Sequence, residues 1–331
     1  MKKIKIKKIL LFTTIIIIVV VIIYSLNFTP KKITYGVSFS PLQAERLELD
    51  WHKTYLAILD DLKVGYVRLS AYWNKIESEK EVLNWSDLDW QMEEAEKRGT
   101  KVILVIGRRV PRWPECHDPS WLGSLSKTEQ DELNLKIIEE EINHYKNYSN
   151  IIAWQVENER LFSLFGTCSK ASRSFLKQEI QLVKSLDSRP TITTDSGELS
   201  FWLRTSGLAD YLGTTVYLKV WNSWIGYWRH LFPPFWYYAR GQMAKYIFGN
   251  QRVIVSELQA EPWEGGKPLK DTPIETQKKD FSLKDFKSNL SLAKKAGFDE
   301  IYFWGAEWWY WLKEKGDNSF WQEAKNIINN N

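Results

Sequence analysis

The sequence contains few of the side chains that usually bind metal ions. Its 331 residues include only four histidines and two cysteines, and none of them stands in an HExxH or CxxC spacing. Neither a structural nor a catalytic metal is therefore expected. Two cysteines also cannot build a disulfide framework, although Cys116 and Cys168 could form one bridge outside the cytoplasm. Two free buried thiols are the alternative.

The chain also lacks the basic surface that nucleic-acid-binding proteins use. Its formal net charge is +4, but seven of its 45 basic residues and none of its 41 acidic residues precede residue 33. The seven are Lys2, Lys3, Lys5, Lys7, Lys8, Lys31 and Lys32. The rest of the chain has 38 basic and 41 acidic residues, a net charge of −3, so no nucleic-acid partner is predicted.

A long apolar run is present only at the N-terminus. After the basic flank of residues 1–8, residues 9–28 read ILLFTTIIIIVVVIIYSLNF, which is long enough to span a bilayer. The run has no small-residue cleavage site, which favours an uncleaved anchor over a signal peptide. The lysines before it favour a cytoplasmic N-terminus. We therefore predict a single-pass anchor in the cell membrane at residues 1–32 and an extracytoplasmic domain at 33–331.

The remaining chain alternates short β-branched or aromatic runs with longer segments of helical period, which is typical of βα units and a parallel sheet. We find no low-complexity tract or interdomain linker, and no GxGxxG loop follows the first run. Eight strands are predicted, at residues 33–40, 66–70, 101–107, 151–157, 191–195, 211–217, 252–257 and 300–305.

The segments between these strands have helical features. Trp51, Tyr55, Ile58, Leu59 and Leu62 are spaced to form one apolar stripe on a helix. Three segments, DDLKVGYVRLS, AEKRGTKVILV and AKKAGFDEIYF, place lysine or arginine and then glycine before the next strand, as expected at a helix C-terminus. Eight βα units in about 300 residues predict a (β/α)8 TIM barrel.

Catalytic groups of such barrels lie at the carboxyl ends of the strands. The fourth predicted strand ends in Glu157, Asn158 and Glu159, and the seventh ends in Glu257. Strands 4 and 7 lie on opposite sides of an eight-stranded ring, so their carboxylates should face each other across the pocket. Opposed carboxylates catalyse glycoside hydrolysis, with one as nucleophile and the other as general acid and base. Glu157 shares the strand period of Glu159 and could serve instead.

These strand ends resemble those of the clan A glycoside hydrolases, which are retaining (β/α)8 enzymes whose strand 4 ends in Asn-Glu and whose strand 7 ends in a nucleophilic Glu. The resemblance spans the whole barrel. It implies that Glu159 is the general acid/base, that Asn158 binds the sugar 2-hydroxyl and that Glu257 is the nucleophile. It implies no cofactor.

Further positions match the same clan. Arg68 in YVRLS corresponds to the arginine after strand 2, Tyr217 to the tyrosine that hydrogen-bonds the nucleophile, and Trp304 to the tryptophan beneath the sugar. Arg68 could instead form a structural salt bridge. The segments SELQAEPW and VPRWPECHDPSWL are most similar to family 42 β-galactosidases, but Arg160 stands where cellulases of the clan carry proline. The metal-binding cysteine cluster of many family 42 members is absent from the sequence.

Eighteen tryptophans are present, and many follow strand ends, where aromatic faces suit sugar rings. We expect about half of this loop group to line a cleft, with Trp113 and Trp263 among them, and we expect Glu261 or Glu307 to contact substrate or support the site. The aromatic segment 218–238 could wall this cleft or enter the membrane headgroup region. Cys116 and Cys168 follow strands 3 and 4, so a disulfide between neighbouring loops is predicted.

The sequence therefore predicts a membrane-anchored retaining β-glycosidase that acts on an extracytoplasmic oligo- or polysaccharide. One alternative is a barrel that binds glycan without cleaving it. Against it stands the joint presence of Glu159, Glu257, Asn158, Arg68 and Tyr217. The other is an envelope transglycosylase with the same carboxylates, because a sugar hydroxyl can replace water in the second step.

Overall fold

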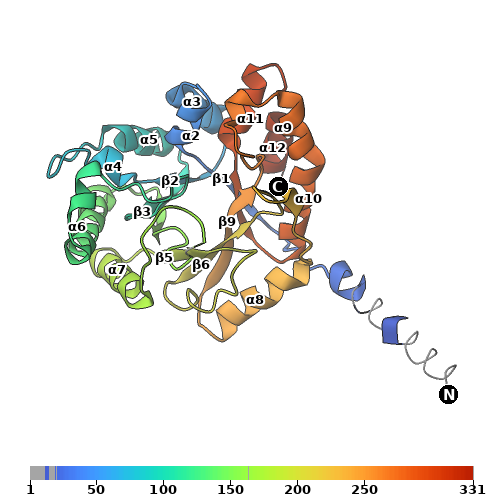
Figure 1. Ribbon diagram of the computed structural model, residues 1–331, viewed down its shortest axis with the longest axis horizontal. Helices are drawn as coiled ribbons and strands as arrows, with labels where there is room; N and C mark the ends of the chain where they lie inside the picture. Colours follow the sequence, from blue (N-terminus) through green and yellow to red (C-terminus); the bar gives the residue numbers. More distant parts are fainter. Residues whose placement is uncertain (1–11, 15–18, 20, 163, 331) are drawn as a thin grey trace.

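Eight parallel strands close into a barrel with helices around it (Figure 1). The computed structural model describes residues 12–14, 19, 21–162 and 164–330. Around the ring the strand order is β1-β10-β9-β6-β5-β4-β3-β2. The strands are β1 (Thr34–Ser38), β2 (Tyr66–Ser70), β3 (Lys101–Ile106), β4 (Ile151–Val156), β5 (Thr191–Asp195), β6 (Tyr211–Val216), β9 (Arg252–Gln259) and β10 (Glu300–Trp304). All eight predicted strands are present, and the predicted TIM barrel is confirmed.

Helices follow the strands and cover the outside of the barrel (Figure 1). The connection from β5 to β6, residues 196–210, consists of turns. The α-helices are α2 (Pro41–Arg46), α3 (Trp51–Asp60), α4 (Trp73–Ile76), α5 (Ser86–Lys97), α6 (Lys127–Tyr145), α7 (Arg173–Leu186), α8 (Pro234–Tyr246), α9 (Ile274–Asp280), α10 (Leu283–Lys295), α11 (Ala306–Glu314) and α12 (Ser319–Asn329). Two short 3₁₀ turns, Ser120–Ser124 and Leu269–Asp271, lie in loops.

The predicted apolar stripe and two of the three predicted glycine C-caps are confirmed. The stripe from Trp51 to Leu62 is buried along α3. Gly99 and Gly297 have φ values of 66° and 86°, as expected for left-handed helix C-caps. In the segment DDLKVGYVRLS, Lys63, with φ 55°, takes the left-handed conformation in place of Gly65.

The barrel interior has an apolar lower layer and a polar upper layer. Ile103, Ala153, Ile192, Ile254 and Tyr302 pack together inside the ring. Side chains alternate between the two faces of a strand. The next inward-facing residue of each strand therefore lies two positions closer to the carboxyl end of that strand. On β2 and β4 these are Arg68 and Gln155, which contact each other there.

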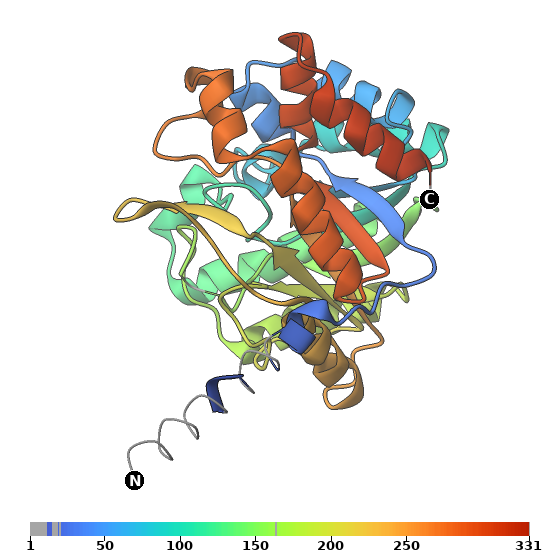
Figure 2. The ribbon, with the colours of Figure 1, turned by 90° about the vertical axis from the view of Figure 1, so that its right-hand side faces the viewer.

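A hairpin follows β6 and was not predicted. It pairs β7 (Lys219–Asn222) with β8 (Gly226–Arg229) in antiparallel register, and it projects from the barrel beside the carboxyl ends of the strands (Figure 2). The predicted aromatic segment 218–238 is therefore this hairpin together with the start of α8.

Within the residues that the structure describes, no helix is both long and apolar enough to cross a membrane. Of the predicted anchor at 1–32, residues 1–11, 15–18 and 20 lie outside the described residues. The anchor therefore stays a prediction.

Candidate active site

Two side chains hold the carboxylate of Glu257 at the carboxyl end of the barrel. Its Oε1 lies 2.8 Å from Nη1 of Arg68, and its Oε2 accepts a 3.1 Å hydrogen bond from the Tyr217 hydroxyl. Burial, with the charge of Glu257 next, raises the pKa of Tyr217 well above its ordinary value, so the tyrosine donates as a neutral hydroxyl. A buried cation and a hydroxyl therefore both stabilise negative charge on Glu257.

An irregularity in β9 directs Glu257 into the barrel. Strict alternation from the inward-facing Ile254 would turn Ser256 inward and Glu257 outward. The register with both neighbouring strands shifts between Val255 and Leu258, as in a β-bulge. The shift lets Ile254 and Glu257 face the same side.

Arg68 lies at the centre of a buried network. Its Nε donates to Gln155 at 2.7 Å, and its Nη2 donates to Oδ1 of Asn158 at 2.9 Å. The Nδ2 of Asn158 donates in turn to Glu115 at 3.1 Å. Arg68 therefore both forms a salt bridge inside the barrel and supports Glu257, so the two predicted roles coexist.

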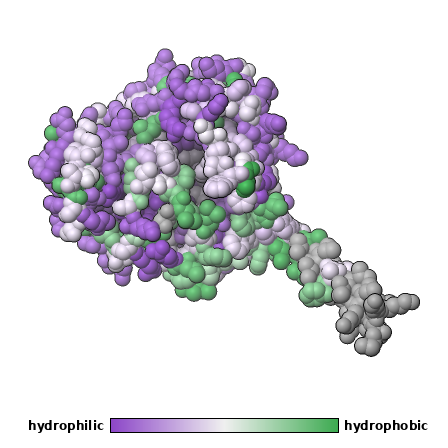
Figure 3. Space-filling model, viewed as in Figure 1, coloured by the Kyte–Doolittle hydropathy of each residue, from purple (hydrophilic) through white to green (hydrophobic). Residues whose placement is uncertain are grey.

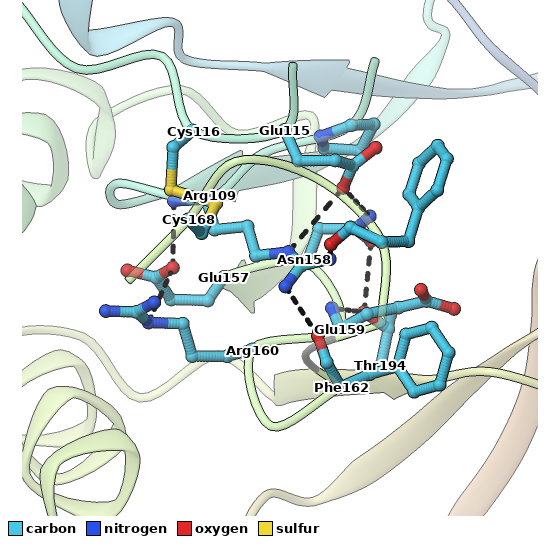
Figure 4. Close-up of polar contacts among 12 residues, drawn as sticks. Arg109, Glu115, Cys116, Glu157, Asn158, Glu159, Arg160, Phe162, Cys168 and Thr194 are labelled. Carbon is cyan, nitrogen blue, oxygen red and sulfur yellow. Dashed lines mark hydrogen bonds and ion pairs between the residues drawn. A yellow bond between two sulfur atoms is a disulfide. The ribbon is translucent and has the colours of Figure 1, made fainter. Parts of the chain in front are cut away.

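Glu159 is in a different environment from Glu257. Its side chain is buried, and in the described part of the chain no hydrogen-bond donor or cation is bonded to its carboxyl group. Burial, with the nearby charges of Glu257 and Glu115 next, raises the pKa of Glu159 well above its ordinary value. Its backbone N–H donates to the Thr194 hydroxyl at 2.8 Å and fixes the turn (Figure 4).

Glu157 does not share the site, so its candidacy as the alternative catalyst is wrong. The side chains of Glu157 and Glu159 point to opposite sides of Asn158 (Figure 4). The Glu157 carboxylate accepts the backbone N–H groups of Arg108 and Arg109 at 3.0 and 2.8 Å and is fully buried. β4 ends at Val156, and Glu157 and Glu159 have positive φ values of 60° and 44°, so the strand period no longer applies.

Glu115 is a third carboxylate at the site that the sequence analysis missed. It lies next to Cys116, which forms the predicted disulfide with Cys168 (Figure 4). Burial raises the pKa of Glu115 to about 7, although the Arg109 guanidinium, 3.7 Å away, lowers it. The available signal was its place in the polar loop after strand 3, in VPRWPECHDPSWL, which we used only for the resemblance.

The folding stability should fall with pH because of Glu115. Its pKa is about 7 in the folded state against 4.5 for the free group, so its contribution is fully present below pH 4.5 and lost as pH rises to about 7. Glu115 should contribute ~3 kcal/mol to the loss, and Glu115→Gln should reduce the loss by about that amount. Urea unfolding at pH 4.5 and pH 8 measures the difference. The exposed Glu132→Gln variant is the control, and an equal pH dependence in both variants would exclude Glu115 as the source.

A second buried cluster surrounds Trp304. The Arg112 guanidinium lies 3.9 Å from the centre of the Trp304 ring and pairs with Glu261 at 2.5 Å and Glu307 at 3.2 Å. Glu307 is fully buried and also accepts the backbone N–H of Ser40. This arrangement fits the supporting role expected for Glu307, and its contact with substrate stays a prediction. Burial raises the pKa of Glu307 to about 7. Arg112 was not predicted, and it covers the Trp304 face on which it stacks.

The predicted rim tryptophans do come together, through a residue that was not predicted. Trp113 packs on Phe165, Phe165 on Trp263, and Trp263 on Tyr217, with ring centres 5.5 to 5.6 Å apart. This row leads from the exposed Trp113 to the hydroxyl that holds Glu257. Other tryptophans that follow strand ends belong to the core, because Trp73 in α4 and Trp308 and Trp309 in α11 are fully buried.

Replacing Arg68 with methionine should strongly destabilise the fold. The change leaves the buried Glu257 carboxylate without its cation, which typically costs ~3 to 5 kcal/mol. Urea unfolding measures this loss. The matched control is Lys270→Met, which breaks an exposed pair with Glu48 and should change stability little. A loss no larger than that of the control would show that the buried pair is dispensable.

Comparison with known proteins gives a fold but no family. No family model matches the sequence, and no curated protein matches it. GH5_18 from Bifidobacterium longum subsp. longum superimposes with a TM-score of 0.60 at 11% identity, covering 83% of this chain and 70% of that one. Xylanase 10B from Thermotoga petrophila gives a TM-score of 0.54 at 14% identity and covers 83% and 82%.

A GH2 β-galacturonidase from Eisenbergiella tayi matches with a TM-score of 0.49 at 16% identity, over 76% of this chain and 39% of that one. The chain therefore spans between 39% and 82% of the lengths of these three proteins. The chain shares its eight-stranded parallel barrel with clan A glycoside hydrolases, as the resemblance implied.

Proposed function

We propose that this protein is a retaining β-glycosidase in which Glu257 is the nucleophile and Glu159 the general acid/base. The observation that carries the proposal is the contrast between the two carboxyl groups. Glu257 is bonded by a cation and a hydroxyl, whereas Glu159 is buried with a raised pKa. Environments that separate two carboxyl groups in this way suit one ionised nucleophile and one protonated acid. The shared barrel fold of glycoside hydrolases supports the same reading.

In the first step Glu257 attacks the anomeric carbon, and Glu159 gives its proton to the departing glycosidic oxygen. A covalent glycosyl ester on Glu257 and a free aglycone alcohol result. In the second step Glu159, now ionised, takes a proton from water as the water oxygen attacks the anomeric carbon and releases Glu257. Arg68 and Tyr217 stabilise the charge of Glu257 before attack and after release.

The other site residues have roles in binding the sugar. Asn158, held by Arg68 and Glu115, is suited to bind the 2-hydroxyl. Trp113 and Trp263 offer aromatic faces along the rim, and Trp304 offers the face that Arg112 leaves free. No cofactor takes part in this mechanism.

We further propose that residues 1–32 anchor the chain in the cell membrane, with the N-terminus cytoplasmic and the barrel outside. The apolar run at residues 9–28 and the lysines before it support this orientation. The Cys116–Cys168 disulfide supports a location of the barrel outside the cytoplasm, where the environment is oxidising.

The direct test is a screen of aryl β-glycosides and polysaccharides, with proton NMR of the first-formed sugar product. Release of the β-anomer is expected, and release of the α-anomer would overturn the retaining mechanism. Binding of glycan without turnover would favour the non-catalytic barrel. Formation of longer products in the presence of an acceptor sugar would assign transglycosylation.

A further inference from the structure

Large apolar side chains are exposed along one edge of the barrel. They come from the turns after β5, the β7–β8 hairpin and the start of α8, and we call them the apolar ridge. The ridge comprises Leu199, Phe201, Trp224, Ile225, Trp228, Leu231 and Phe235. Its exposed fractions run from 39% at Phe235 to 91% at Trp224. Contiguous exposure of this kind usually marks a binding surface.

Contacts between aromatic rings link the three parts of the chain that form the ridge. His230 packs 4.2 Å from Trp228 and 5.4 Å from Phe232. Trp236 continues the row, 5.2 Å from Phe232 and 5.4 Å from Phe201. The hairpin, the turns after β5 and α8 are therefore packed into one unit.

The N-terminal segment leaves the barrel at this ridge. The Tyr24 hydroxyl donates to the backbone oxygen of Leu231 at 2.5 Å, and the Phe28 ring stacks 3.6 Å from the ring of Tyr238 in α8. Val21 and Ile22, just before these contacts, are 60% and 52% exposed. In Figure 3 apolar side chains gather along the same edge, next to this segment.

The sequence around the ridge is rich in basic residues, and two of them, Lys219 and Arg229, pair with Asp285. No aspartate or glutamate occurs between Asp210 and Glu257, whereas this stretch contains five lysines and arginines. Arg204, three residues after Phe201, is exposed, and so are Lys31 and Lys32, which follow Phe28. Basic side chains next to exposed tryptophan match the anionic headgroup region of a bilayer, where tryptophan rings are favoured.

We propose that the apolar ridge rests in the headgroup region of a lipid bilayer and so fixes the orientation of the barrel on the membrane. Tyr24 and Phe28 stand at the end of the 20-residue apolar sequence 9–28, and their contacts with Leu231 and Tyr238 argue for lipid as the occupant of the ridge. The ridge also reaches the site, because the Tyr227 hydroxyl in the hairpin donates to the backbone oxygen of Trp263 at 2.5 Å. The rim of the candidate active site then opens close to the membrane surface.

The test measures contact between the ridge and lipid in the full-length protein. Because both native cysteines are paired, an added cysteine takes a nitroxide spin label selectively. Labels are placed by Leu199→Cys and Ile225→Cys in the ridge. Val82→Cys, which is 57% exposed in the turn between α4 and α5, is the matched control (Figure 1). The proteins are reconstituted in vesicles of phosphatidylcholine and phosphatidylglycerol.

Power saturation then compares collisions of each label with oxygen, which concentrates in lipid, and with a water-soluble nickel chelate. We expect the oxygen-to-nickel ratio at residues 199 and 225 to exceed that at residue 82 several-fold. Equal ratios at all three positions, or failure of the chain to float with vesicles, would overturn the proposal. Spin–spin broadening confined to the ridge labels would assign the ridge to a second copy of the chain. None of these readings depends on glycosidase activity.

Discussion

Replacing Glu257 with alanine is expected to lower kcat on aryl β-glycosides by at least ~10⁴-fold, because the glycosyl ester can no longer form. Azide should restore part of the rate, since the small anion can occupy the space of the missing carboxylate and attack the anomeric carbon. The rescued product should be a glycosyl azide of inverted configuration. Initial rates and NMR of the product measure both effects.

The matched control is Glu157→Gln, which alters a buried carboxylate on the other side of Asn158 (Figure 4). Its folded fraction should keep most of its activity. Wild-type protein treated with a 2-fluoro glycoside should carry the label on Glu257. A label on another residue, or activity retained in Glu257→Ala, would show that Glu257 is not the nucleophile.

Replacing Glu159 with glutamine is expected to lower kcat/KM on substrates with poor leaving groups by ~10²- to 10⁴-fold. Substrates that release dinitrophenolate should lose much less in the first step, because this leaving group departs without a proton. The first step needs protonated Glu159, so wild-type activity should persist to pH values above the ordinary range of a glutamate. It should then fall as pH rises through the raised pKa of Glu159.

The pH profile of kcat/KM separates Glu159 from its neighbour. The pKa of Glu115 is raised to about 7, so Glu115 could titrate in the same range. We expect the alkaline fall to disappear in Glu159→Gln and to remain in Glu115→Gln. The opposite pattern would transfer the acid/base role to Glu115.

Strand positions were predictable from local sequence, but strand ends were less so. Short apolar β-branched runs bounded by polar residues favour buried strands, and such runs placed all eight barrel strands. β9 runs to Gln259, two residues past its predicted end, because its register shift depends on pairing with both β6 and β10. The hairpin of β7 and β8 was missed, because its aromatic side chains resembled a cleft wall rather than a strand pair.

Site residues at strand ends were likewise predicted, whereas site residues in loops were missed. Glu159, Glu257, Arg68 and Tyr217 were found because each comes at or beside the end of a predicted strand. Arg112 and Glu115 were missed, because they lie in the loop after β3, where the chain has no period. Both have positive φ values, 90° and 75°, which a sequence pattern does not reveal.

By itself the sequence determined the barrel, the two candidate carboxylates and the possibility of a disulfide. These follow from periodicity, from strand order and from side-chain chemistry, all of which act locally or through the ring closure that eight βα units impose. Only the tertiary structure decided that Glu157 is turned away, that Arg112 covers a face of Trp304 and that Glu307 is buried. These outcomes depend on backbone turns and on charges brought together from distant segments, and burial sets the protonation of such groups only after the chain has folded.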